Sequence, residues 1–240
     1  MEKALVFDNV TIRMSGRTLF NGINLDINAG DRSAFLGPNG IGKSLMLELL
    51  ALGCSRELAK RYKGLEIDGQ IVDSEGRDLL DPLTNRSIAY VTQNEEFYNN
   101  STVYDEAETA CNGVGIDLDD SKLDYYLKEF GIFEKKKAKI KNNVSYGEGK
   151  IIHLITRLLK LEACNIMLLD EPLNHLSFQN SRVFNRLMKE EINKNPSLTV
   201  IMVSHCRAMD FVSQAIVYES ETQKLFVKPY HAYDCFNRSY

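Results

Sequence analysis

The sequence predicts an α/β fold built around a mainly parallel β-sheet. In the second half of the chain, short apolar segments alternate with segments of helical periodicity, and each short segment is apolar throughout. Such strands are typical of a parallel sheet that helices cover on both faces. An earlier apolar segment runs directly into a glycine-rich loop. No internal repeat or linker is apparent, so residues 1–240 are expected to form a single domain.

The first half of the chain is expected to contribute short strands separated by turn-forming residues. These strands are placed at residues 5–10, 22–27, 33–36 and 87–92. A turn at Ser15-Gly16 separates the first two, and a hairpin with its turn at Asp68-Gly69 is expected over residues 64–72. Leucines at helical spacing over residues 44–52 predict a helix that Gly53 ends.

The second half is expected to begin with a mainly helical region at 101–143, amphipathic near 122–130. The alternation that follows is a helix at 149–161, a strand at 166–169, a helix at 179–192 and a strand at 199–203.

The composition is that of an ordinary globular protein, with 44% hydrophobic and 26% charged residues. A formal net charge of −4 provides no general attraction to nucleic acid or anionic lipid. No apolar run approaches the roughly 20 residues that span a bilayer, and no signal-peptide pattern is present, so a cytosolic location is expected. The five cysteines form no C-x-x-C pair and are expected to be reduced.

Eight consecutive residues match the phosphate-binding pattern G-x-x-x-x-G-K-[ST]. They are Gly37, Pro38, Asn39, Gly40, Ile41, Gly42, Lys43 and Ser44. The glycines let backbone N–H groups curl around phosphate oxygens, and the helix that follows adds partial positive charge. Lys43 is expected to neutralise the β- and γ-phosphates, and the Ser44 hydroxyl to ligate Mg²⁺. The loop therefore predicts a P-loop nucleotide-binding core.

Two carboxylates directly follow the apolar segment 166–169. Asp170 and Glu171 are therefore expected at the C-terminal tip of a strand, beside the phosphate-binding loop. Asp170 is expected to hold Mg²⁺, usually through water. Glu171 is expected to orient an attacking water or to accept its proton.

Two further polar residues follow predicted strands. Gln93 comes after the strand that ends at residue 92, where its amide is expected to reach Mg²⁺ or the attacking water. His205 comes after the strand 199–203 and Ser204, where it is placed to touch the γ-phosphate. A purely structural role for this histidine remains an alternative.

A second anion-binding corner is expected where residue 145 opens a helix. Ser145 supplies a hydroxyl group and Gly147 exposes backbone N–H. This corner cannot serve the same phosphate from the same side as the loop at 37–44.

Together these motifs resemble those of the ATP-binding cassette (ABC) ATPases, over essentially the whole chain and in the family's order. They are Walker A at 37–44, the Q-loop glutamine Gln93, the signature at 145–148, Walker B with its catalytic glutamate at 166–171, the D-loop at 174–177 and the switch histidine His205. The resemblance implies a P-loop NTPase core with a mainly parallel sheet, an N-terminal antiparallel β subdomain and a helical subdomain at about 95–150.

The resemblance also implies a reaction, ATP + water → ADP + phosphate, with ATP and Mg²⁺ bound. It assigns Glu171, His205, Gln93 and Lys43 to catalysis, and Ser44, Gln93 and Asp170 to the metal. Family members pair head to tail, so that Ser145, Gly147 and Glu148 would contact ATP held by a second cassette. Either a homodimer or a cassette heterodimer is implied.

The chain departs from the family at several positions. Met14 stands where an aromatic residue normally stacks on adenine, and is assigned to ATP binding as a thioether that packs on the base. In the signature, Tyr146 replaces a glycine and Glu148 a glutamine. Ile151 replaces a common basic residue, and Ser177 replaces the D-loop aspartate, which predicts slower hydrolysis.

Two functions fit this resemblance. The first is the ATP-hydrolysing subunit of a transporter whose transmembrane subunit is a separate chain, with the cassette held at the cytoplasmic face of the membrane by that partner. The second is a soluble ATPase acting on ribosomes or nucleic acid, because residues 170–176 resemble the corresponding motif of ABC-F proteins. Those proteins carry two cassettes joined by a charged linker, so the transporter subunit is favoured and a nucleic-acid partner is not expected.

Overall fold

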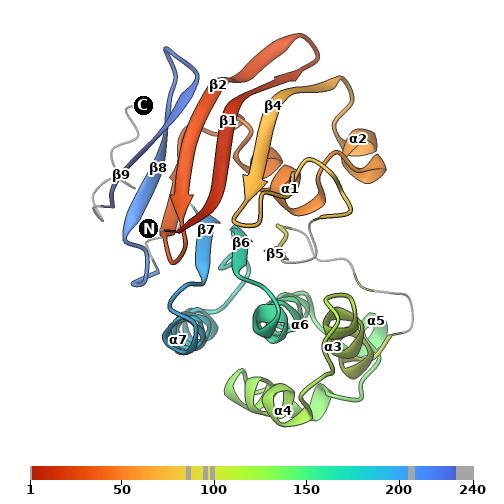
Figure 1. The fold of residues 1–240 in the computed structure, drawn as a ribbon. Helices are drawn as coiled ribbons and strands as arrows, with labels where there is room; N and C mark the ends of the chain where they lie inside the picture. The colour runs from red at the N-terminus through yellow and green to blue at the C-terminus, as the bar shows by residue number, and fades with distance from the viewer. Residues whose placement is uncertain (1, 85–87, 94–96, 98–100, 205–208, 231–240) are drawn as a thin grey trace.

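The structure is a computed structural model, and it describes residues 2–84, 88–93, 97, 101–204 and 209–230. Its central element is a six-stranded sheet with the strand order β5-β6-β7-β3-β8-β9 (Figure 1). The strands are β5 (Ile88–Val91), β6 (Ile166–Asp170), β7 (Thr199–Val203), β3 (Arg32–Leu36), β8 (Gln214–Glu219) and β9 (Lys224–Pro229). The first five are parallel and β9 is antiparallel to β8, which confirms the predicted fold class.

A second, antiparallel sheet has the order β2-β1-β4 and is built from β1 (Lys3–Met14), β2 (Arg17–Asn28) and β4 (Leu65–Asp73). The predicted turn at Ser15-Gly16 joins β1 to β2, and both of its residues have positive φ.

The predicted hairpin at Asp68-Gly69 is wrong, because β4 continues through both residues. Asp8 pairs with Gln70 and Thr11 with Asp68, so β1 carries extra residues opposite Gly69. Gly69 has a φ of 91°, and a Cβ there would lie 2.5 Å from the carbonyl oxygen of Asn9. The glycine therefore marks a bulge with close backbone approach rather than a turn.

Helix α1 (Lys43–Leu52) lies between the two sheets (Figure 1). Its apolar residues, among them Leu45, Met46 and Leu49, belong to one buried cluster with residues of both sheets. A short helix, α2 (Arg56–Arg61), follows, and it begins at the N-cap Ser55.

The opposite face of the large sheet is covered by α6 (Tyr146–Leu159) and α7 (Phe178–Lys194). Beyond α6 lie α3 (Val103–Asn112), α4 (Asp120–Glu129) and α5 (Ile140–Asn143), with short 3₁₀ turns at Phe133–Lys135 and Lys160–Glu162. The apolar residues of α6 are buried along most of its length, as its helical spacing predicted. No helix in the part of the chain that the structure describes is long and apolar enough to cross a membrane.

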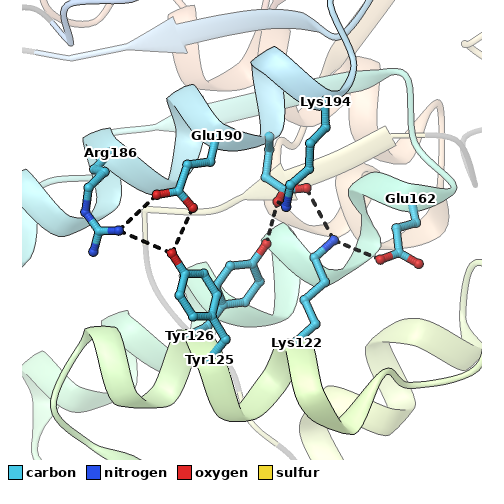
Figure 2. A network of polar contacts seen from close by, with 8 residues as sticks. Lys122, Tyr125, Tyr126, Glu162, Arg186, Glu190 and Lys194 are labelled. Carbon is cyan, nitrogen blue, oxygen red and sulfur yellow. Dashed lines mark hydrogen bonds and ion pairs between the residues drawn. The ribbon is translucent and has the colours of Figure 1, made fainter.

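A polar network joins α4 to α7 (Figure 2). The Tyr126 hydroxyl donates to the buried carboxylate of Glu191 at 2.9 Å, and Lys122 Nζ lies 3.3 Å from the same carboxylate. Nearer the surface, the Tyr125 hydroxyl donates to Glu190 at 2.9 Å. The network fixes α4, and with it the outer helices, against the core of the molecule.

Candidate functional site

Four neighbouring parallel strands end at one edge of the large sheet, and residues of the predicted site lie at or just beyond the ends of three of them. The phosphate-binding loop follows β3, Gln93 follows β5, Asp170 ends β6, and Ser204 follows β7. Their carboxyl ends meet because the strands are parallel and adjacent, and such an edge is the usual ligand site of an open α/β sheet.

The loop at 37–42 depends on glycines with left-handed backbone. Gly40 has a φ of 78° and Gly42 a φ of 100°. A Cβ at Gly42 would lie 3.1 Å from the ring of Phe20, so the backbone also passes close to the core. Lys43 is buried, and its Nζ donates to the carbonyl oxygens of Gly37 at 2.9 Å and Pro38 at 2.8 Å. Burial lowers the pKa of Lys43, and the nearby carboxylates of Glu171 and Asp170 partly oppose that shift.

A hollow of about 340 Å³ opens at the start of α1. It is lined by Met14, Leu19, Asn39, Gly40, Gly42, Lys43, Ser44, Leu45, Tyr62, Glu171 and Val203. Most of the predicted loop residues thus surround one space, together with Met14 and Glu171. The side chain of Ile41 instead packs into the buried cluster between the sheets, so that residue contributes its backbone.

The predicted metal ligands Ser44 and Asp170 lie side by side. The Ser44 hydroxyl hydrogen-bonds the Asp170 carboxylate, whose Oδ1 is buried and has no hydrogen-bond partner among the described residues. Burial raises the pKa of Asp170 to about 6, although the bond from Ser44 acts in the opposite direction. A buried carboxylate with an unpaired oxygen beside a hydroxyl group is a donor set that suits Mg²⁺.

Glu171 leaves the sheet in a left-handed conformation with a φ of 48°. Its N–H donates to the Val203 carbonyl at 2.8 Å, and the Asn174 side-chain amide donates to its carboxylate. The carboxylate is thereby held at the hollow, in position to orient a water molecule.

Gln93 and His205 are the two other predicted catalytic residues, and the structure describes only Gln93. Gln93 lies two residues beyond the end of β5 with an exposed side chain, and it does not line the hollow. His205 lies outside the described residues.

The signature residues also lie away from the hollow. Ser145 is the N-cap of α6, Gly147 is in its first turn, and Glu148 completes a capping box with Ser145. The exposed ring of Tyr146 stands edge-on to His175, with 4.8 Å between centroids. None of the residues of this turn lines the hollow.

Sequence reasoning missed Tyr62, which lines the hollow together with Met14. Its hydroxyl hydrogen-bonds Glu48, and burial followed by the Glu48 carboxylate raises the pKa of Tyr62 to about 12. The residue reaches the hollow because Ser15 N–H donates to the Gly64 carbonyl at 2.9 Å. That contact draws the end of the α2 segment to the β1–β2 turn, and no local sequence pattern announces it.

A phosphate-binding loop and a held glutamate around one hollow, with the buried Asp170 carboxylate beside Ser44, define a P-loop nucleotide-hydrolysing protein. Residues 20–174 match the model of the ABC transporter family, and the chain belongs to that family. It is an ATPase of the ATP-binding cassette type.

The relatives differ in how much of their own length this chain covers. A sulfate/thiosulfate import ATP-binding protein of Mesostigma viride is 28% identical over 96% of this chain, which spans 64% of that relative. An ergothioneine transport ATP-binding protein of Helicobacter pylori is 25% identical, with 95% of this chain and 96% of the relative covered. The structure of an ATP-binding subunit of an ABC transporter superposes with a TM-score of 0.76 at 16% identity, covering 94% of this chain and 90% of that one. That likeness shows the fold.

Proposed function

We propose that this chain is the ATP-hydrolysing subunit of a transporter, working as a head-to-tail pair of cassettes attached to a separate transmembrane subunit. The observation that carries the proposal is the division of phosphate-binding groups between two places. Lys43 and Ser44 line the hollow, whereas Ser145 and Gly147 lie at the start of α6 and outside it. Two chains facing each other would complete two ATP sites.

Within one site, each group has a separate task. The loop N–H groups and Lys43 bind the β- and γ-phosphates. Ser44 and Asp170 would hold Mg²⁺, which neutralises charge on the phosphates when bound. Glu171, held by Asn174, orients the attacking water and accepts its proton. Gln93 and His205 are proposed to approach the metal and the γ-phosphate from the neighbouring strand ends.

The transmembrane partner is proposed from the relatives, whose names describe import and transport ATP-binding proteins. Such a partner would hold the cassette at the cytoplasmic face of a membrane. We assign the docking role to a helical subdomain at about 95–150, within which α3, α4 and α5 stand apart from the sheet.

Fractionation of cells that produce the tagged chain tests this assignment. The chain is expected to sediment with membranes and to co-purify with a multi-span membrane protein. A chain found with ribosomes and never with membranes would instead support the second candidate, a soluble ATPase. ATPase activity of a chain found only with ribosomes would leave the enzyme assignment intact while rejecting the transport assignment.

A further inference from the structure

One face of helix α6 carries three basic side chains that are buried or half-buried within the molecule. Lys150, His153 and Arg157 are spaced three and four residues apart, which places them on a single face of the helix. Lys150 is 0% exposed and His153 is 3% exposed, while Arg157 is half-buried. Buried groups of this kind are costly unless they are hydrogen-bonded, so their partners define what they do. We call these three residues the basic face of α6.

The basic face binds the backbone of one short segment. Arg157 Nε donates to the Tyr90 carbonyl at 2.7 Å, inside strand β5. The Thr92 N–H donates to His153 Nε2 at 3.2 Å, just past the end of that strand. Lys150 Nζ donates to the Thr92 carbonyl at 3.0 Å and lies 3.4 Å from the Gln93 carbonyl.

These contacts follow the chain from β5 to Gln93. β5 is the edge strand of the sheet and pairs only with β6 among the described strands. Beyond Val91 the ladder to β6 ends, so the sheet no longer fixes the position of the backbone. The basic face supplies hydrogen bonds at that point.

The chemistry of His153 suits its place in this set. Burial lowers the pKa of His153 well below its ordinary value, and the cations Arg157, Lys150 and Lys160 act in the same direction. The ring is therefore neutral, and Nε2 has a lone pair with which to accept the Thr92 N–H.

We infer that the basic face of α6 is a set of positioning residues for Gln93. It fixes the backbone from which the Gln93 amide reaches toward Mg²⁺, and it does so from the helix that begins at Ser145. Lys150 is five residues along α6 from Ser145, about 7.5 Å of helix. A shift of α6 caused by phosphate binding at Ser145 would therefore move Gln93 of the same chain. This inference rests on the proposed function, because it gives Gln93 a role at the metal.

Two substitutions of nearly equal size at His153 separate positioning from packing. His153→Gln keeps an acceptor for the Thr92 N–H, whereas His153→Leu removes it and fills the space with an apolar group. A residue that only packs in the core would tolerate leucine better than glutamine. If His153 positions Gln93, the His153→Gln variant is expected to behave like the wild type, and the His153→Leu variant is expected to be impaired.

The measurement is binding of the non-hydrolysable analogue AMP-PNP to the full chain, by calorimetry, with a titration of Mg²⁺ and a parallel titration in EDTA. Mg²⁺ is expected to increase the affinity for AMP-PNP. In the His153→Leu and Lys150→Met variants, the Mg²⁺ concentration that gives half of this increase is expected to rise about tenfold, as for other residues that support a metal ligand. Affinity for AMP-PNP in EDTA is expected to stay unchanged, because the loop at 37–44 is untouched. Melting curves confirm that each variant is folded.

Mg²⁺ dependence identical to the wild type in both folded variants overturns the inference. So does a His153→Gln variant as impaired as His153→Leu. A wild-type chain that fails to bind AMP-PNP at any Mg²⁺ concentration rejects the proposed function instead. Should Lys150→Met fail to fold, the two His153 variants decide the question.

Discussion

Ser145 and Glu148 hydrogen-bond each other reciprocally at the start of α6. The Glu148 N–H donates to Ser145 Oγ at 3.3 Å, and the Ser145 N–H donates to the Glu148 carboxylate at 2.8 Å. The backbone bond from Ser145 lowers the pKa of Glu148, so this carboxylate is ionised at neutral pH. Ser145 therefore uses Oγ as an acceptor while its O–H proton stays available to donate to a phosphate.

Substitutions at Ser145 are expected to prevent ATP-driven pairing without affecting binding in a single chain. Ser145→Arg blocks the turn sterically. Ser145→Asp retains an N-cap acceptor for α6 but directs a negative charge at the incoming phosphate. Both variants should remain monomeric by light scattering with ATP present, while ATP affinity of the monomer stays within about twofold, a difference of about 0.4 kcal/mol. Loss of ATP binding by the monomer would place Ser145 in its own chain's site.

Glu171→Gln is expected to trap a dimer with ATP bound. The amide no longer accepts the proton of the attacking water, whereas Lys43 and Ser44 still bind the nucleotide. We expect the steady-state hydrolysis rate to fall by about 100-fold or more, with nucleotide affinity retained. Phosphate release and size-exclusion chromatography measure the two effects. A normal hydrolysis rate in this variant contradicts the role assigned to Glu171.

Tyr62 is expected to contact the base or ribose of the nucleotide, because it lines the hollow beside Met14 and is not part of the phosphate-binding loop. Tyr62→Leu should weaken ATP binding by about tenfold, within the range of base–aromatic stacking. Tyr62→Phe keeps the ring and serves as the control. Inorganic tripolyphosphate, which has no base, should bind all three proteins equally. Equal losses for ATP and tripolyphosphate would instead indicate damage to the loop.

Asp170→Asn is expected to stabilise the protein in EDTA. Because the pKa of Asp170 is raised in the folded state to about 6, its ionisation opposes folding, and the free energy of unfolding falls as the pH rises from about 4 to 6. Asparagine does not ionise, so the variant should gain roughly 2–3 kcal/mol at pH 7 and nothing below pH 4. Urea unfolding at several pH values measures this. A variant less stable than the wild type at pH 7 contradicts it.

The network between α4 and α7 allows a comparison of a buried charge with a half-buried one. Glu191→Leu leaves Lys122 and the Tyr126 hydroxyl without their buried partner, and is expected to lower the free energy of unfolding by about 3 kcal/mol. Glu190→Gln, nearer the surface, should lower it by less than about 1 kcal/mol. Urea denaturation measures the free energy of unfolding of both variants. Equal decreases would show that the buried carboxylate of Glu191 stabilises the fold no more than Glu190 does.

Much of the fold and most of the hollow were predictable, because the decisive patterns are local. An apolar run followed by glycines and a lysine, or by two carboxylates, predicts a strand. It also predicts that the polar residues lie at the carboxyl edge of the sheet. The prediction failed where contacts between distant parts of the chain determine the local structure or the position of a side chain. Gly69 lies in a strand because Asn9 passes above it, and Tyr62 reaches the hollow through the contact between Ser15 and Gly64. Strands β8 and β9 went unpredicted, since β8 is fixed by its pairing with β3.

The ammonium group of Lys43 crosses its own loop to the carbonyl oxygens of Gly37 and Pro38. The loop is thereby already curved, and Gly40 and Gly42 are already in left-handed conformations. In the proposed site, an incoming phosphate would replace those carbonyl oxygens as the partner of the Lys43 ammonium, and the loop would lose little further backbone freedom on binding. Nucleotide binding at this loop would therefore require an exchange of partners at Lys43 and little rearrangement of the loop backbone.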